Sequence, residues 1–233
     1  MEITVIYGQN HKGSSYHVSR MVLESITNSD DIIHEFFLPK DGPDYCLGCY
    51  QCIQSDPELC PQSEKVQKIS LALRSSHIIL ISSPTYCYEM TGQLKTLFDH
   101  LGYQWLSHRP EKEMFGKIGI SISTTAGAGA KNVTQSISHQ MFWWGIGRHY
   151  KLPLIVSAAR WTEVSNKTKS TIEKKVHLLT KKINKSMLPV KPTLKTKLLF
   201  KLMKGMQNNN TWNPVDKQHW LDNQWLEGEK PWR

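Results

Sequence analysis

The chain has 233 residues, 39% of them hydrophobic and 21% charged, which is enough for one large domain with a packed core. No stretch approaches the roughly 18 consecutive apolar residues that a membrane-spanning helix needs, and the amino-terminal residues lack the basic and apolar regions of a secretory signal. We therefore expect a cytoplasmic protein rather than a membrane-spanning or secreted one.

Short apolar strands alternate with helical segments along most of the chain. Strands are expected at residues 3–7, 32–38, 78–81, 117–123 and 152–157, and helices at 15–28, 64–75, 91–104, 131–146 and 167–186. This alternation predicts a parallel sheet covered by helices on both faces, because right-handed crossovers leave few other arrangements. The expected fold class is α/β, a doubly wound five-stranded parallel sheet with strand order 2-1-3-4-5.

The loop after the first strand suits a phosphate group. Residues 8–15 read Gly-Gln-Asn-His-Lys-Gly-Ser-Ser, without an acidic side chain, and they open onto a helix. Free backbone N–H groups and the dipole at a helix amino terminus attract anions. The alternative is an ordinary turn in which Ser14 or Ser15 caps the helix.

Four of the five cysteines lie between the second strand and the third. Cys46, Cys49, Cys52 and Cys60 have the spacing C-x2-C-x2-C-x7-C, and a proline follows the fourth. This spacing is typical of ferredoxin-type motifs whose thiolates hold a four-iron cluster. Zinc is the weaker alternative, because four thiolates also form a tetrahedral zinc site.

Two further loops follow strands at the same edge of the sheet. Pro84 stiffens the exit from the third strand, and the ring of Tyr86 offers a flat face to an aromatic ligand. The small residues at 123–129, which follow the fourth strand, let the backbone approach a ligand closely. Because the first and third strands flank the switch point of such a sheet, all of these loops should face one crevice.

The pattern Ser-Pro-x-Tyr at 83–86, followed by Thr-Gly-Gln-Leu-Lys at 91–95, resembles the FMN-binding loop of the flavodoxin-like NAD(P)H-dependent oxidoreductases. This family contains the NADPH-dependent FMN reductases and the iron-sulfur flavoproteins, and the resemblance reaches the tail at Asp216, Trp220 and Trp225. It implies a flavodoxin-like fold that binds FMN and takes electrons from NAD(P)H. No side chain is expected to be catalytic, because the flavin carries the chemistry.

The resemblance also implies which residues form the FMN site. They are Gln9, His11, Ser14, Ser15, Pro84, Thr85, Tyr86, Cys87, Thr124, Thr125 and Gly127. The thiol of Cys87 either touches the flavin or is a small buried hydrophobic group, and we expect the second. For the four clustered cysteines the family leaves two alternatives, a four-iron cluster as in iron-sulfur flavoproteins or reduced thiols as in plain reductases.

Beyond residue 188 the sequence changes character. We expect an FMN-binding domain at 1–188 and an extension at 189–233, with a helix at 193–206 and a tail that holds four of the eight tryptophans. Such an aromatic tail should pack on its own domain or on a partner subunit. We expect a homodimer to which it contributes.

The formal charge of +9 is concentrated between Lys167 and Lys204, where twelve lysines face one acid, Glu173. A solvated helix surface is the expected interpretation. Two alternatives are attraction of an anionic partner, such as NADPH or an acidic redox protein, and contact of the helix at 193–206 with a membrane surface. Nucleic acid is not expected, because no recognised nucleic-acid motif accompanies the charge.

The sequence thus predicts an FMN-dependent NAD(P)H oxidoreductase that reduces a small acceptor, such as a quinone, a free flavin or a nitroaromatic compound. The alternative is an electron carrier with FMN and an iron-sulfur cluster that receives electrons from a protein donor. A third hypothesis keeps the fold as a binding or regulatory module without a cofactor.

Overall fold

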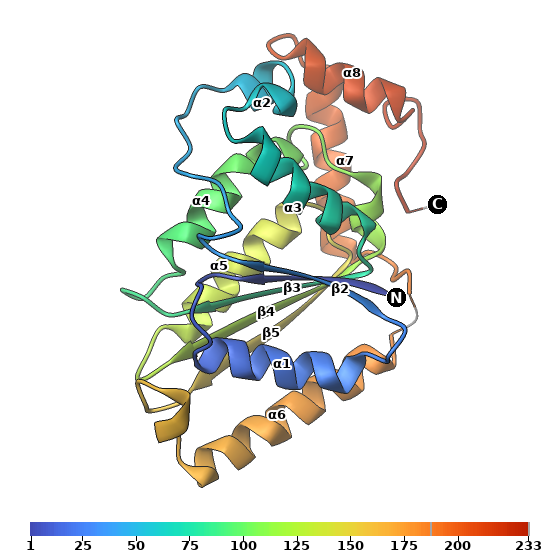
Figure 1. Ribbon diagram of the computed structural model, residues 1–233. Helices are drawn as coiled ribbons and strands as arrows, with labels where there is room; N and C mark the ends of the chain where they lie inside the picture. The colour runs from blue at the N-terminus through green and yellow to red at the C-terminus, as the bar shows by residue number, and fades with distance from the viewer. Residues whose placement is uncertain (187, 233) are drawn as a thin grey trace.

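The computed structural model describes residues 1–186 and 188–232 and contains one parallel sheet (Figure 1). Its strands run side by side in the order β2-β1-β3-β4-β5. They are β1 (Glu2–Tyr7), β2 (Ile32–Phe37), β3 (Ile78–Pro84), β4 (Ile118–Thr125) and β5 (Arg148–Ile155). Every neighbouring pair is parallel. The predicted doubly wound, flavodoxin-like architecture and its strand order are therefore confirmed.

Helices cover both faces of the sheet (Figure 1). The helices α1 (Ser14–Ile26) and α6 (Asn166–Asn184) pack on one face, and α3 (Ser63–Ser75), α4 (Gly92–His100) and α5 (Ala130–Trp143) pack on the other. A short helix, α2 (Gln51–Gln54), lies in the cysteine-containing segment. Short 3-10 turns occur at Pro57–Leu59, Gly102–Gln104, Lys112–Gly116 and Trp161–Glu163.

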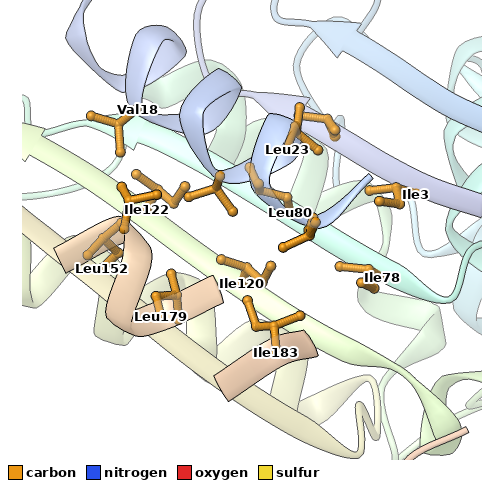
Figure 2. Packing of buried hydrophobic residues seen from close by; sticks show 14 of the residues in the cluster. Ile3, Val18, Leu23, Ile78, Leu80, Ile120, Ile122, Leu152, Leu179 and Ile183 are labelled. Carbon is orange, nitrogen blue, oxygen red and sulfur yellow. The ribbon is translucent and has the colours of Figure 1, made fainter. Parts of the chain in front are cut away.

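Alternation along the central strands sends successive side chains to opposite faces. Leu80 and Ile120 face α1 and α6, whereas Ile79 and Ile81 belong to the cluster beneath α3, α4 and α5. Figure 2 shows the first of these clusters, in which Val18 from α1 and Ile183 from α6 approach the strands. Burying each of these aliphatic side chains stabilises the fold by about 2 kcal/mol, so both layers anchor the sheet.

The chain differs from the sequence-based prediction where polar residues extend an element. β5 begins at Arg148 instead of residue 152, and Arg148 pairs with Ile118 of β4. β5 is an edge strand, so its first residues remain partly exposed and do not form an apolar run. Conversely, α4 ends at His100, earlier than expected, and a 3-10 turn continues the chain.

The carboxyl-terminal extension forms two helices, α7 (Leu194–Asn208) and α8 (Pro214–Asp222). They enclose a third cluster of buried side chains, in which Trp220 and Trp225 pack with Phe115 of the sheet domain. The tail therefore packs on its own domain, one of the two predicted arrangements. The boundary at residue 188 stays a prediction.

Within the described residues, no helix has the length and the apolar character that crossing a membrane requires.

Acid should destabilise this fold through His149. Its Nε2 donates to the carbonyl oxygen of Ile146 at 2.9 Å, and burial lowers its pKa from 6.5 to about 4. Between these values the unfolded chain binds a proton at this residue and the folded chain does not, so folding stability falls as the pH drops. The free energy of unfolding should decrease by about 2 to 3 kcal/mol from pH 6.5 to pH 4 through this group alone.

The variant His149→Gln keeps an amide donor but cannot take up the proton. Urea unfolding at the two pH values should therefore show a smaller decrease in the variant than in the unmodified chain. Equal decreases in both proteins would contradict the assignment to His149.

Candidate functional site

A hollow of about 190 Å³ opens at the carboxyl edge of the sheet, where the loops after β1, β3, β4 and β5 meet. Its lining comes from those loops and from the first residues of α1. The lining residues are Gln9, His11, Gly13, Ser14, Ser15, Pro84, Thr85, Tyr86, Thr124, Thr125, Ala126, Val156, Ala158 and Ala159. None of these side chains is acidic, so the hollow presents hydroxyls, amides, an imidazole and apolar groups.

The amino terminus of α1 faces this hollow without a side-chain cap. Gly13 is the N-cap residue, and among the residues that the structure describes no side-chain cap accepts from the first-turn N–H groups. The alternative in which Ser14 or Ser15 caps the helix is therefore wrong. The hydroxyl of Ser15 instead forms a hydrogen bond of 2.7 Å with the hydroxyl of Thr124, and both residues line the hollow. The positive end of the helix dipole thus remains available for an anion.

Gly8 ties the loop after β1 to strand β3 and to Thr91, the N-cap residue of α4. Its N–H donates to the carbonyl oxygen of Ser82 at 2.7 Å, and the hydroxyl of Thr91 donates to the Gly8 carbonyl. A Cβ atom at Gly8 would lie 3.0 Å from both the Ser82 carbonyl oxygen and the Thr91 hydroxyl. A second link joins the loops after β1 and β3, because the Tyr86 hydroxyl donates to Oε1 of Gln9 at 3.0 Å.

Beyond Pro84 the chain makes a tight turn between Tyr86 and Glu89, whose backbones exchange hydrogen bonds of 2.9 and 3.0 Å. The two central residues, Cys87 and Tyr88, have φ angles of 50° and 64°. Residues other than glycine rarely adopt these backbone angles, and each such residue adds about 1 to 3 kcal/mol of backbone strain. Cys87 is exposed at this turn, so the expectation of a small buried hydrophobic group is wrong.

Gly129 allows the loop after β4 to approach this turn. Its φ is 98°, and a Cβ atom there would lie 2.7 Å from Cγ2 of Thr85 and 3.2 Å from the Cα of Tyr88. Thr85 also receives support from the β4 side, since its N–H donates to the Thr124 carbonyl oxygen at 3.0 Å. The two loops therefore form one wall of the hollow.

The structure brings together nine of the eleven residues expected to bind FMN. These are Gln9, His11, Ser14, Ser15, Pro84, Thr85, Tyr86, Thr124 and Thr125. Cys87 and Gly127 do not line the hollow, and both are exposed.

The loop after β5 also contributes to the hollow, and its residues were not predicted from the sequence. Val156, Ala158 and Ala159 line the hollow on that side. A signal for them was present, because every parallel strand of such a sheet ends at the same edge and the fifth is followed by small residues at 157–159.

The four cysteines at 46–60 share one segment and differ in exposure. Cys46 and Cys49 are exposed, and Cys52 and Cys60 are half-buried. Burial raises the pKa of the Cys52 thiol, and the other three thiols act in the same direction. In the described part of the chain, no group of three His, Cys, Asp or Glu side chains is arranged to hold a metal ion.

His100 holds Cys60 in this arrangement. The imidazole Nε2 donates to the Asp44 carbonyl oxygen at 2.8 Å, which leaves Nδ1 to accept from the Cys60 thiol at 3.5 Å. The donor set, four soft sulfur ligands, suits an iron-sulfur cluster chemically.

The extension clamps the cysteine segment through a buried ion pair. Nη1 of Arg109 donates to Oδ1 of Asp216 at 2.9 Å and to the carbonyl oxygen of Ile53 at 2.9 Å, and Nη2 donates to the Cys52 carbonyl. Asp216 is fully buried, and its other oxygen accepts from Nδ1 of His108 at 2.7 Å. The position of α2 thus depends on a carboxylate from α8.

A family model described as NADPH-dependent FMN reductase matches residues 1–161. An iron-sulfur flavoprotein of Archaeoglobus fulgidus is 28% identical over 149 residues, which cover 63% of this chain and 64% of that protein. An FMN-dependent NADH:quinone oxidoreductase of Burkholderia pseudomallei is 25% identical over 132 residues, which cover 54% and 61% respectively. The chain therefore spans less than two thirds of either relative.

Among solved structures, the chain resembles an azoreductase from Bacillus anthracis with a TM-score of 0.58 and 14% sequence identity. The match covers 79% of this chain and 99% of the azoreductase. At this identity the likeness establishes the fold.

Replacing the buried carboxylate should loosen the extension and the cysteine segment together. In Asp216→Asn the guanidinium of Arg109 loses its counter-charge in a buried site, which should lower the free energy of unfolding by about 3 kcal/mol.

The matched control is Asp222→Asn on the same helix, where the carboxylate is exposed and accepts from Gln218. That change should have an effect within about 0.5 kcal/mol. Urea unfolding measures both, and similar losses in the two variants would refute the clamp.

Proposed function

Because the chain belongs to the NADPH-dependent FMN reductase family, we propose that it is an FMN-dependent NAD(P)H oxidoreductase that passes electrons to a small acceptor. One observation carries the proposal. The uncapped amino terminus of α1 and the strained turn at Tyr86–Glu89 border one hollow that has no acidic side chain in its lining.

The residues present fit FMN. The hydroxyls of Ser14 and Ser15, with the N–H groups of the first turn of α1, would hold the phosphate. The backbone of Thr85 and the side chain of Tyr86 would border the ring system on one side, and Thr124 would border it on the other.

When bound, FMN supplies the chemistry, accepting hydride from reduced nicotinamide and passing electrons on. The protein's residues orient the ring and neutralise the phosphate, so no side chain needs to transfer a proton. The name of the Burkholderia relative supports a quinone as the class of acceptor. An azo compound, a free flavin or a nitroaromatic compound would meet the same open edge of the site.

A negative charge at the start of α1 should repel the phosphate of FMN. Ser14→Asp places a carboxylate in the first helical turn, where it favours the helix itself but should weaken FMN binding at least about tenfold. Riboflavin lacks the phosphate, so its affinity should change little. Quenching of flavin fluorescence measures both affinities.

Ser29→Asp is the control for this change, because Ser29 is exposed in the turn after α1, away from the hollow. Its FMN affinity should equal that of the unmodified protein. Equal weakening of riboflavin and FMN binding in Ser14→Asp would mean that the phosphate does not lie at this helix terminus.

Mixing the FMN-loaded protein with NADPH or NADH without oxygen tests the activity. Rapid bleaching of the flavin absorbance, followed by reoxidation on addition of a quinone, is the expected outcome. Bleaching only after a reduced redox protein is added would favour the electron carrier instead. Protein that takes up no FMN would favour a binding or regulatory module.

The second candidate is an electron carrier that holds a four-iron cluster on Cys46, Cys49, Cys52 and Cys60. It is favoured by the four thiols of one segment and by the name of the Archaeoglobus relative. Anaerobic reconstitution with iron and sulfide should then give stoichiometric iron, which Cys49→Ser should reduce and Cys87→Ser, outside the motif, should leave unchanged. Equal iron in both variants would exclude this ligand set.

Association into a homodimer and the cytoplasmic location stay predictions. Trp220 and Trp225 are buried inside the chain, whereas Trp212 of the same tail is exposed. Light scattering at micromolar concentration measures whether a dimer forms.

A further inference from the structure

Helix α7 presents a row of apolar side chains to solvent. Leu194, Leu198, Leu202 and Met206 follow one another at intervals of four residues, and their exposed fractions are 83%, 69%, 60% and 57%. Side chains at this spacing lie along one side of a helix. We call these four residues the α7 stripe. Single exposed leucines are ordinary on a protein surface, whereas four in a row mark a contact surface.

The other side of α7 fixes the orientation of the stripe. Phe200 and Met203 are buried against Trp220 and Trp225, and the side chain of Gln207 donates to the Ser107 carbonyl oxygen at 2.8 Å. These contacts hold α7 on the domain in the absence of a partner. The α7 stripe cannot turn inward unless the packing of Phe200 and Met203 against the tryptophans is broken.

Lysines lie beside the α7 stripe, and the helix itself carries no acidic residue. Between residues 185 and 206 the chain has six lysines and neither Asp nor Glu. Lys195 and Lys201 are exposed beside the stripe. A groove of about 540 Å³ along the helix is lined by Lys197, Lys201, Lys204 and Lys230, with Phe200, Trp232, Gly228 and Glu229. The face thus combines an apolar ridge with a strongly positive border.

These charges decide between the candidate occupants. In a symmetric dimer the same patch meets itself, so a second copy would bring the four lysines of α7 against the same four. An acidic protein would neutralise the lysines but need not cover the apolar ridge. An anionic lipid surface does both, because the apolar side chains enter the acyl boundary while the lysines contact headgroups.

We propose that the α7 stripe and its lysines dock this protein onto membranes that carry anionic lipid. The proposal does not rest on the proposed oxidoreductase activity, since the hollow at α1 contributes no residue to this face. It replaces the expectation of a merely solvated helix surface for the part of the lysine-rich region that lies on α7.

Flotation with lipid vesicles tests the proposal on the full chain. The unmodified protein should float with vesicles made of equal parts phosphatidylcholine and phosphatidylglycerol, and it should stay behind with phosphatidylcholine alone. Added salt should release it, because screening weakens the attraction between lysines and headgroups. Both lipid arms use the same protein sample, so misfolding cannot produce the difference.

Two double variants separate the apolar from the charged contribution. Leu198→Gln with Leu202→Gln, and Lys195→Gln with Lys201→Gln, change exposed residues only and should each lower the partition coefficient at least about tenfold. The matched controls lie on α3, where Leu71, Lys65 and Lys68 are also exposed. Leu71→Gln, and Lys65→Gln with Lys68→Gln, should leave binding unchanged.

Four outcomes would overturn the proposal. They are absence of binding to anionic vesicles, equal binding to both vesicle types, equal losses in the controls, and a concentration-dependent dimer that Leu198→Gln with Leu202→Gln dissociates. The last outcome would assign the stripe to a second copy of the chain, and light scattering without lipid detects it.

Discussion

The hydrogen bonds from Gly8 to Ser82 of β3 and from Thr91 to Gly8 hold the loop after β1 against β3 and the end of the loop that follows it, and the candidate site depends on these bonds. Parallel strands bring the two loops to one edge, but they do not set how closely the loops approach. A residue without a Cβ at position 8 allows that approach. The uncapped start of α1 and the turn after Pro84 then border the same hollow.

Much of this architecture could be predicted from the sequence, because buried strands are rich in apolar residues. The strands β1, β3 and β4 are covered on both faces and are rich in β-branched residues, so their positions and order were predicted. The start of β5 was not, since an edge strand tolerates Arg148 and Lys151. The serines and threonines of the site were predicted from the resemblance to the FMN-binding loops of the family, on loops and strand ends that meet at one edge of the sheet.

Features that depend on backbone angles or long-range pairing stayed hidden. The exposure of Cys87 follows from a turn whose two central residues have positive φ angles. Cysteine and tyrosine are not residues that predict such a turn from sequence, as glycine or asparagine would be. Likewise, α8 contains no apolar periodicity that would mark it, because its buried residues are Asp216 and Trp220. Their partners lie more than a hundred positions earlier in the chain, at His108 and Arg109.

The ion pair between Arg109 and Asp216 makes the cysteine segment depend on α8, although the two are far apart in the sequence. In a homologous chain without α8, the guanidinium of Arg109 would contact the carbonyl oxygens of Cys52 and Ile53 but would have no carboxylate to balance its charge. Inheritance of the arginine and of the extension should therefore be coupled. Relatives with a shorter carboxyl terminus are expected to carry an uncharged residue at the position of Arg109 and a differently folded cysteine segment.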